Sequence, residues 1–460
     1  MHTHLKNEPL SQDDLTDLAL LRLDIIAAIG VKDNLPDNIY TAHLMPQGSE
    51  KPIEVLPPVN FHRFNLDFIS FIESLEEEMD RKRLFDQSEI PTRSGKDLRE
   101  RAILISVSKK PKYEQEDSLE ELKELAFSSD VLVLDAVIQR PKDINPKYLM
   151  GEGKLKDVII NALNKGATLL IFDQDLNPSQ VKEIGELTEL KVIDRSQLIL
   201  DIFARRAHSR DGKVQVELAQ LKYRLPRLTG KGTAMSRLMG GIGGRGPGEM
   251  KLEIDRRRVR DRITLLEKEL KSLSEARKQR KQRRVEKMIP IVSIIGYTNA
   301  GKSTLLNSLT RSEVFVEEKM FATLDTASRR LRFPKERDVI ITDTVGFIRD
   351  LPKDLMTAFK SSLEELQDAD LLLHLVDISN PRFEQQMESV ENILRELNLT
   401  DKKRITVFNK ADKVAEDEIK NIALRYDAIY ISALRQSTFN PLLDVIEKNI
   451  WDTGKFEGEK

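Results

Sequence analysis

The sequence predicts an α/β fold in which a small parallel α/β domain carries an antiparallel helical-hairpin arm and is followed by a larger α/β domain. Strand-like apolar runs alternate with amphipathic helical segments in residues 101–197 and again in residues 289–450, a pattern typical of parallel sheets covered by helices. Between them, apolar residues repeat at heptad spacing in residues 198–288, which indicates paired helices. We expect residues 1–100 to form part of a mostly helical N-terminal extension and residues 451–460 to form a C-terminal tail.

The composition is that of an ordinary globular protein. The chain has 460 residues, of which 33% are charged and 40% hydrophobic, and its net charge is −2. It contains no cysteine, which excludes a disulfide scaffold, a thiolate nucleophile and a cysteine-based zinc site. No apolar run reaches the roughly 18 residues of a membrane helix, and the N-terminus has no signal-peptide pattern. We therefore expect a cytoplasmic monomer without an integral membrane segment, and peripheral contact with a membrane is left open.

The N-terminal extension begins with a cluster of potential metal ligands. His2, His4 and Asp14 belong to an H-x-H…S-x-x-D pattern, which resembles the signature of JAMM-type zinc peptidases, where two histidines and an aspartate bind the metal. The spacing is one residue short, Leu5 replaces the usual proline, and no glutamate-bearing strand precedes the pattern. A disordered start or a relic is the favoured interpretation. An N-terminal zinc hydrolase with a regulatory nucleotide-binding domain is kept as an alternative hypothesis.

The small α/β domain is expected to contain four strands separated by helices. Expected strands cover residues 102–107, 131–137, 167–172 and 191–193, and expected helices in the first 200 residues cover 15–23, 66–84, 119–127, 155–164 and 179–187. Gly151-Glu152-Gly153-Lys154 precedes one of these helices, where backbone N–H groups could bind an anion. Two glycines before a helix are a weak signal, so a turn that starts the helix is favoured over a second anion site.

The two helices expected in the hairpin carry matching apolar seams. The seam residues are spaced alternately by four and three positions and comprise Val214, Leu218, Leu221, Leu225 and Leu228 in one helix and Val259, Ile263, Leu266, Leu270 and Leu273 in the other. Seams of this spacing pack on each other. The connecting segment 229–248 is too rich in glycine to be helical. We therefore predict an antiparallel hairpin, residues 198–288, with a flexible basic tip.

Positive charge is concentrated in this arm. Residues 251–287 contain 15 Lys and Arg against 7 Asp and Glu, and residues 205–250 contain 10 against 3. The outer faces of coiled coils are always charged, but their signs are usually balanced. The imbalance therefore favours contact with RNA phosphates over a merely solvated coiled coil.

The larger α/β domain begins with a strand–loop–helix motif that binds phosphate. The apolar run 291–295 leads into a G-x-x-x-x-G-K-[ST] pattern and then into a helical segment, the context in which this pattern is specific. The pattern consists of Gly296, Tyr297, Thr298, Asn299, Ala300, Gly301, Lys302 and Ser303. Its glycines allow backbone N–H groups to point toward a phosphate. We expect Lys302 to reach the β- and γ-phosphates and Ser303 to bind Mg²⁺, and a Gly-rich turn is the structural alternative.

Three further motifs follow in order, each at the carboxyl end of an expected strand. They comprise Asp343, Thr344, Val345 and Gly346, then Asn409, Lys410 and Asp412, and finally Ser432, Ala433 and Leu434. Asp343 can hold a water bound to Mg²⁺, and the Gly346 N–H can approach the γ-phosphate. Asp412 can accept hydrogen bonds from N1–H and the exocyclic amine of guanine, which adenine cannot supply, and residues 432–434 supply a backbone N–H for guanine O6. Since open α/β sheets bind ligands at this edge, the motifs predict a P-loop GTPase domain.

A switch segment is expected between the phosphate loop and Asp343. It contains Phe321, Ala322, Thr323, Leu324 and Asp325. Thr323 is the best candidate for the threonine that binds Mg²⁺ beside Ser303 in the GTP state, and Thr326 is a weaker alternative. Phe347 stands where Ras-type GTPases have the glutamine that orients the attacking water. With Lys302, Thr323 and Gly346 as the only catalytic candidates, we expect slow intrinsic hydrolysis and a partner that stimulates it.

Several strings along the chain resemble the HflX family of ribosome-associated GTPases, and the resemblance covers about residues 101–450. The strings lie at Gly151–Lys154, Asp201–Ala207, Arg245–Glu249, Leu252–Glu253, Asp255–Arg257, Phe321–Asp325 and Asp343–Ile348. The resemblance implies binding to the large ribosomal subunit, an arm that reaches toward the peptidyl-transferase region, ribosome-stimulated hydrolysis of GTP, and splitting of stalled or stress-idled ribosomes. The tip departs from the usual family pattern at Gly244, Met250 and Lys251. Action on immature large subunits during ribosome assembly is the alternative, and use of ATP beside GTP is left open.

Overall fold

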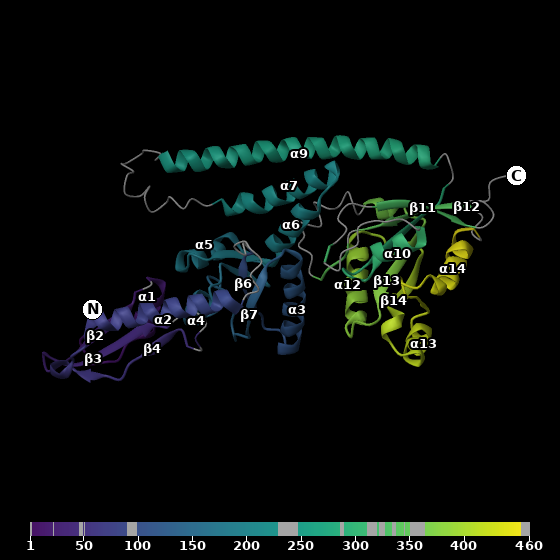
Figure 1. The fold of residues 1–460 in the computed structure, drawn as a ribbon. Helices are drawn as coiled ribbons and strands as arrows, with labels where there is room; N and C mark the ends of the chain where they lie inside the picture. Colours follow the sequence, from purple (N-terminus) through teal and green to yellow (C-terminus); the bar gives the residue numbers. More distant parts are fainter. Residues whose placement is uncertain are drawn as a thin grey trace. The chain divides into compact units, whose positions relative to one another are not determined.

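A computed structural model describes residues 2–21, 23–45, 49, 51–89, 99–228, 247–285, 289–310, 320–321, 327–333, 337–344, 346–349 and 364–451 (Figure 1). The chain divides into two compact units, Met1–Arg195 and Ser196–Lys460. Among the described residues, no helix is both long enough and apolar enough to cross a membrane.

The first unit opens with a five-stranded sheet. Its strands are β1 (His2–His4), β2 (Ile25–Lys32), β3 (Leu35–Leu44), β4 (Ile53–Val55) and β5 (Val59–Asn60), and its helices are α1 (Gln12–Leu20) and α2 (Phe68–Glu89). The expected helices are present, but the expectation of a mostly helical extension is wrong because it left out this sheet. The missed signal is Asp33-Asn34, where both residues have positive φ of 49° and 64° and join β2 to antiparallel β3, as in a two-residue hairpin turn.

The start of the chain forms a strand, β1, at His2–His4. Strand β1 pairs in parallel with β2, with His2 opposite Ala28 and His4 opposite Gly30. The expectation of a disordered start is therefore wrong. The strand was missed because three residues of sequence show too little alternation to be distinguished from a loop.

The small parallel α/β domain is confirmed. Its elements are β6 (Arg101–Val107), α3 (Lys112–Ser128), β7 (Leu132–Gln139), α4 (Glu152–Asn164), β8 (Leu169–Phe172), α5 (Pro178–Leu187) and β9 (Lys191–Asp194). The strands are all parallel in the order β7-β6-β8-β9, and α4 and α5 cover one face with a buried apolar core. A Cβ added at Gly151 or Gly153 would meet nothing within 4 Å, so these glycines fit the interpretation as a turn that starts α4.

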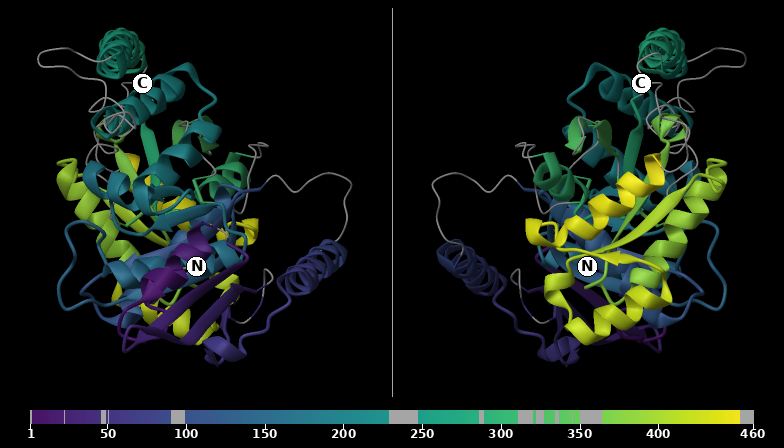
Figure 2. Two further views of the ribbon diagram at one scale, coloured as in Figure 1. Left: turned by 90° about the vertical axis from the view of Figure 1, so that its left-hand side faces the viewer. Right: turned by 90° about the vertical axis from the view of Figure 1, so that its right-hand side faces the viewer.

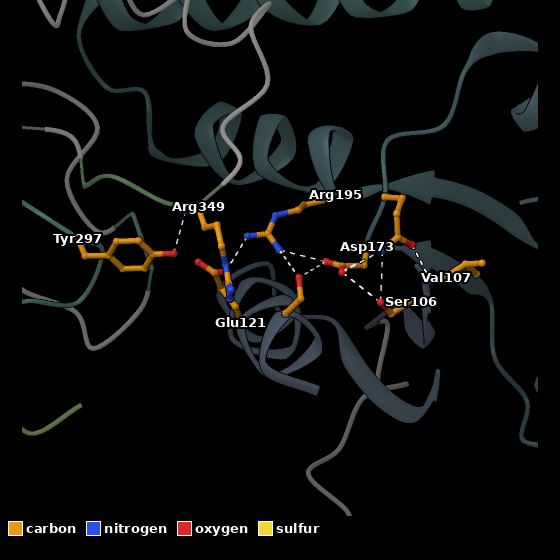
Figure 3. A network of polar contacts seen from close by, with 9 residues as sticks. Ser106, Val107, Glu121, Asp173, Arg195, Tyr297 and Arg349 are labelled. Carbon is orange, nitrogen blue, oxygen red and sulfur yellow. Dashed lines mark hydrogen bonds and ion pairs between the residues drawn. The ribbon is translucent and has the colours of Figure 1, made fainter. Parts of the chain in front are cut away.

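A buried ion-pair network is centred on Arg195, the last residue of this unit (Figure 3). The Arg195 guanidinium lies 2.8 Å from Glu121 and 3.1 Å from Asp173. Hydroxyl groups of Ser118 and Ser106 donate to the two oxygens of Asp173. Because all the charges are paired and hydrogen-bonded, the network avoids the cost of an isolated buried charge.

The second unit begins with the predicted helical hairpin. Helix α6 (Arg195–Arg206) leads to α7 (Arg210–Arg224), a 3₁₀ turn at Leu225–Arg227, and α9 (Pro247–Val285), which lies along α7 (Figure 1). Seven of the ten predicted seam residues form one apolar cluster: Val214, Leu218, Leu221, Ile263, Leu266, Leu270 and Leu273. The 39 residues of α9 correspond to a length of about 58 Å. Most of the predicted tip lies outside the described residues.

The rest of the second unit is a six-stranded sheet in the order β11-β12-β10-β13-β14-β15. Its elements are β10 (Ile291–Gly296), α10 (Lys302–Thr310), β11 (Ala327–Phe333), β12 (Arg337–Asp343), β13 (Leu371–Asp377), α12 (Phe383–Glu396), β14 (Arg404–Asn409), α13 (Glu416–Arg425), β15 (Ile429–Tyr430) and α14 (Asn440–Trp451). All pairings are parallel except that of edge strand β11. Helices α10 and α14 cover one face, and α12 and α13 cover the other (Figures 1 and 2). This doubly wound arrangement places the carboxyl ends of the parallel strands at one edge.

Candidate nucleotide-binding site

The phosphate loop lies between the end of β10 and the start of α10. Gly296 and Gly301 have positive φ of 154° and 91°, a region that side chains rarely adopt. A Cβ at Gly296 would lie 2.2 Å from the Leu375 carbonyl oxygen, and one at Gly301 would lie 2.4 Å from Nδ2 of Asn409. The backbone therefore requires glycine at both positions, and the loop curls around the N-terminus of α10, where N–H groups and the helix dipole favour an anion.

Lys302 lies inside this loop and is buried. Its Nζ donates a hydrogen bond of 2.9 Å to the Tyr297 carbonyl oxygen. Burial lowers the pKa of Lys302 from 10.5 to about 8, and the negative charge of Asp343 opposes this shift. A Cβ added at Gly346 would lie 3.0 Å from Nζ, so the ammonium group and the backbone of Gly346 approach the same point.

Two oxygen donors meet beside the lysine. The Ser303 hydroxyl donates a 2.6 Å hydrogen bond to Oδ2 of Asp343, which ends β12 next to β10 in the sheet. A hydroxyl and a carboxylate are hard ligands of the kind that Mg²⁺ prefers, so the residues present fit this ion. The other predicted Mg²⁺ ligand, Thr323, lies outside the described residues, as do Ala322, Leu324, Asp325 and Val345.

The segment after Asp343 is joined to the phosphate loop by hydrogen bonds. Thr298 N–H donates to the Phe347 carbonyl oxygen at 2.8 Å, and Phe347 N–H donates to the Gly296 carbonyl oxygen at 3.1 Å. The Tyr297 hydroxyl accepts a 2.8 Å bond from the Arg349 N–H (Figure 3). Phe347 is 3% exposed, so its phenyl ring is packed inside the protein instead of facing water. No water-orienting group is available from this side chain.

Asn409 connects the phosphate loop to the predicted base-recognition residues. Its Nδ2 donates to the Ala300 carbonyl oxygen at 2.8 Å, and its Oδ1 accepts from the Ala433 N–H at 2.8 Å. Asp412 is exposed, and its pKa is held below the ordinary value mainly because the Ser432 side chain stabilises the carboxylate. The predicted guanine-binding residues thus come together beside the phosphate loop.

Two residues that the sequence motifs did not single out also position the site. Asp377 at the end of β13 pairs with Nζ of Lys410 at 2.7 Å and so holds a residue whose backbone is left-handed, with φ of 60°. Arg349 anchors Tyr297 through its backbone N–H. Asp377 had a detectable signal, since a carboxylate ends residues 371–376, which are apolar except for His374. A backbone contact such as that of Arg349 has no counterpart in the sequence pattern.

The described part of the switch segment packs against the helix that leads to the arm. Phe321 has a positive φ of 55° and is 2% exposed. Its ring lies edge-on to that of Phe203 in α6, with centroids 4.6 Å apart. The start of the switch segment is therefore in contact with α6.

Comparisons with known proteins agree with this geometry. Three family profiles match: "GTP-binding GTPase N-terminal" over residues 116–204, "GTP-binding GTPase Middle Region" over residues 206–284, and "50S ribosome-binding GTPase" over residues 291–410. The protein GTPase HflX of Caldanaerobacter subterraneus is 48% identical over 353 residues, which are 77% of this chain and 81% of that protein. The chain belongs to the HflX family of GTPases.

A second HflX relative and one solved structure are also similar to this chain. GTPase HflX of Escherichia coli K12 is 41% identical over 322 residues, which are 70% of this chain and 75% of that protein. A GTP-binding protein from Sulfolobus solfataricus, solved in complex with GDP, is 27% identical, with a TM-score of 0.42 over 77% of this chain and 99% of that chain. The HflX relatives and the P-loop domain establish this chain as a GTP hydrolase.

Proposed function

We propose that this HflX-family GTPase binds the large ribosomal subunit as a monomer, hydrolyses GTP to GDP and phosphate when the subunit stimulates it, and splits or rescues stalled or idle ribosomes under stress. We assign subunit binding to the arm at residues 198–288 and nucleotide hydrolysis to residues 289–450. The observation that carries the proposal is the excess of positive charge in the arm.

The arm keeps part of this charge available for a partner. Arg210 and Arg262 pair across the hairpin with Glu269 and Glu217, so these cations stabilise the arm itself. Four others on α9 are exposed and have no ion pair within the described part of the chain: Arg257, Arg260, Lys268 and Lys271. Cations of this kind bind nucleic-acid phosphates through release of counterions.

The phosphate loop supplies the hydrolytic chemistry. Lys302, held near the Gly346 backbone, places a positive charge where the bridging and γ-phosphate oxygens gain negative charge. Ser303 would hold Mg²⁺ together with Thr323, and Asp343 would support the ion through a bound water. When bound, Mg²⁺ neutralises the charge shared by the β- and γ-phosphates.

The base-recognition residues select guanine. Asp412 is ionised and exposed, so it can accept the N1–H and the exocyclic amine. Ser432 N–H already donates to Thr438, and Ala433 N–H donates to Asn409. The N–H of Leu434, which makes no hydrogen bond within the described part of the chain, is the group that can serve guanine O6 without giving up an existing partner.

Stimulation by the ribosome is proposed because of Phe347. Its buried ring cannot orient water, and we infer that the partner supplies or orders a group that does. The contact of Phe203 with Phe321 can transmit a movement of the arm to the switch segment, because a shift of α6 changes the packing of Phe321.

The test is GTP turnover by the purified protein, alone and with saturating large ribosomal subunits, with Lys302→Ala as the blank and ATP as the competing substrate. The double variant Arg257→Glu/Arg260→Glu should weaken subunit binding by roughly tenfold or more and lower its salt dependence by about two counterions. The matched control Lys110→Glu/Lys142→Glu makes the same charge change in the small domain and should bind normally. Phe203→Ala should keep subunit binding and lose most of the stimulation.

Two outcomes would contradict the proposal. Fast turnover that large subunits do not change would mean that Phe347 is compensated within the protein. Equal loss of binding in the two charge-reversal variants would mean that net charge, not the arm, determines affinity. Accumulation of precursor particles after deletion of the gene would favour the assembly alternative over the splitting of mature ribosomes.

A further inference from the structure

Two histidines and one aspartate converge at the first strand of the N-terminal sheet. His2 and His4 are two positions apart on β1, so their side chains lie on the same face of the strand, and Asp14 lies in the first turn of α1. Nε2 of His2 is 3.1 Å from Oδ1 of Asp14, and Nε2 of His4 is 3.3 Å from Oδ2 of the same carboxylate. The two Nε2 atoms are 2.9 Å apart. Within the described part of the chain, this is the one group of three potential metal ligands that converges in this way.

The separations match those around a small metal ion. Zinc binds nitrogen and oxygen ligands at about 2.0–2.2 Å in tetrahedral geometry, which places neighbouring ligand atoms about 3.3 Å apart. The two histidine nitrogens are 2.9 Å apart, and they lie 3.1 and 3.3 Å from different oxygens of Asp14. One ion could therefore bind both nitrogens together with both carboxylate oxygens or, after rotation of the carboxylate, with a single oxygen.

Neighbouring groups already orient two of the three ligands. Nδ1–H of His4 donates to the Glu8 carbonyl oxygen at 2.9 Å, which leaves the lone pair of the neutral ring on Nε2, facing Asp14. Oδ2 of Asp14 accepts from both N–H and Oγ–H of Ser11, at 2.6 and 2.7 Å. Outer hydrogen bonds of this kind fix the tautomer and direction of metal ligands.

The segment that joins β1 to α1 is also fixed. Nδ2 of Asn7 donates to Asp37 at 2.7 Å, and the Asn7 carbonyl oxygen accepts from the Tyr40 hydroxyl at 3.0 Å. A Cβ added at Gly30 on β2 would lie 2.0 Å from Oδ1 of Asn7, so the segment packs tightly on the sheet. The ligands are therefore held by the fold before any ion binds.

We propose that His2, His4 and Asp14 bind one divalent transition-metal ion of the Zn²⁺ class. Two imidazoles among three ligands favour Zn²⁺, Co²⁺ or Ni²⁺ over Mg²⁺ and Ca²⁺, which prefer oxygen. The side chains of His2, His4 and Asp14 are 37%, 12% and 16% exposed, so the ion can enter from solvent and keep a water as its fourth ligand. The site is separate from the GTPase chemistry and does not depend on the function proposed above.

A hydrogen bond occupies this position when no ion is bound. Two Nε2 lone pairs cannot face each other at 2.9 Å, so without an ion one ring must carry its proton on Nε2. A metal ion displaces this hydrogen bond and ties β1 to α1 through three bonds. Its binding should therefore raise the melting temperature of the N-terminal unit.

The experiment uses the full chain with a histidine-free tag at its C-terminus, treated with a chelator and then titrated with ZnCl₂ in the presence of Mg²⁺ and GDP. Calorimetry and elemental analysis should give one Zn²⁺ per chain, and Co²⁺ should give the strong visible absorption of a four-coordinate ion. His4→Ala and the conservative Asp14→Asn should each weaken Zn²⁺ binding by 100-fold or more. His62→Ala, which removes an exposed histidine elsewhere in the same unit, should bind Zn²⁺ normally.

Folding of the variants is checked by their GDP affinity and by the melting temperature without metal. The proposal is overturned if the wild type binds no more Zn²⁺ than Asp14→Asn, because the cluster is then only a hydrogen-bond network. It is equally overturned if both ligand variants keep the wild-type affinity, because the ion then binds elsewhere. Loss of the Zn²⁺-dependent rise in melting temperature in Asp14→Asn alone, with His62→Ala unchanged, supports it.

Discussion

The hydroxyl of Ser303, at the start of α10, donates a 2.6 Å hydrogen bond to Oδ2 of Asp343, the last residue of β12. The two residues are far apart in the sequence and meet because β10 and β12 are parallel neighbours, so the loop after one strand lies beside the end of the other. This pair brings the phosphate loop and the predicted Mg²⁺ support into one cluster.

Ser303→Ala should weaken GTP binding in the presence of Mg²⁺ by about tenfold to a hundredfold. The variant removes a predicted Mg²⁺ ligand, and a loss of this size corresponds to about 1.4–2.8 kcal/mol of binding free energy. The measurement is titration of a fluorescent GTP analogue at several Mg²⁺ concentrations. The neighbouring Thr304→Ala is the matched control and should bind normally. If Ser303→Ala loses equal affinity with Mg²⁺ chelated, the hydroxyl acts on the loop and not on the ion.

Nucleotide affinity should fall as pH rises above 8. Burial lowers the pKa of Lys302 to about 8 in the protein without nucleotide, so the ammonium that phosphates require is lost above this pH. The apparent affinity for GDP should then drop by up to about tenfold per pH unit between pH 8 and 9. Calorimetric titration from pH 7 to 9 measures this, and Lys302→Met should bind weakly with no such slope. A flat wild-type profile would contradict a titrating Lys302.

The contribution of Lys302 to folding stability changes with pH in the opposite direction to its contribution to nucleotide affinity. The pKa of Lys302 is lower in the folded chain than the ordinary value of 10.5, so the unfolded chain binds more protons between about pH 8 and 10.5. The contribution of this residue to the free energy of unfolding therefore rises with pH in that window. Deprotonation of Lys302 thus does not destabilise the fold above pH 8, so unfolding caused by this residue would not explain a loss of nucleotide binding.

Much of this fold was predictable because its signals are local. Alternating strand and helix patterns marked the parallel sheets, and the seam around Leu266 followed from heptad spacing. The N-terminal sheet was missed for two reasons. Its first strand, β1, is only three residues long, and the order of strands in the sheet depends on pairing between distant segments. Its one clear local sign was Asp33-Asn34, whose left-handed φ values join β2 to β3.

The candidate site also combines features that local sequence predicts with features that it does not. The phosphate loop and Asp412 follow from residue types at fixed spacing. The bridge from Asn409 to Ala300 and Ala433 and the contact of Phe203 with Phe321 depend on three-dimensional packing, which spacing does not encode. The convergence of His2, His4 and Asp14 was visible as a pattern, but its geometry required the parallel pairing of β1 with β2.

Leu266→Ala should destabilise the hairpin by about 2–4 kcal/mol, the usual cost of removing a buried leucine side chain. Leu266 is 0% exposed and lies at the centre of the seam, whereas the adjacent Leu265 is 54% exposed. Leu265→Ala is therefore a matched control that should change stability by less than about 0.5 kcal/mol. Hydrogen exchange of amides in α7 and α9 measures local opening. Equal exchange rates in the two variants would mean that the helices do not depend on their mutual seam.

The GTPase domain should lose stability in mild acid through His374. This residue is 1% exposed in the central strand β13, and burial lowers its pKa from 6.5 to about 3, with the positive charge of Arg404 acting in the same direction. The folded chain therefore keeps the ring neutral while the unfolded chain protonates it below pH 6.5. The stability conferred by the neutral ring is complete above that pH and falls by about 1.4 kcal/mol per pH unit between 6.5 and 3.

His374→Leu separates this effect from the titration of carboxylates, which the wild type and the variant share. Urea unfolding at pH 7, 6 and 5 gives the free energy of unfolding of both proteins. From pH 7 to pH 5 this free energy should fall by about 2 kcal/mol more in the wild type than in His374→Leu. His62→Leu, which removes an exposed ring in the N-terminal unit, should track the wild type at every pH. A constant difference between wild type and His374→Leu would mean that His374 is protonated in the fold, and the sheet around it would then have to supply a partner for a buried positive charge.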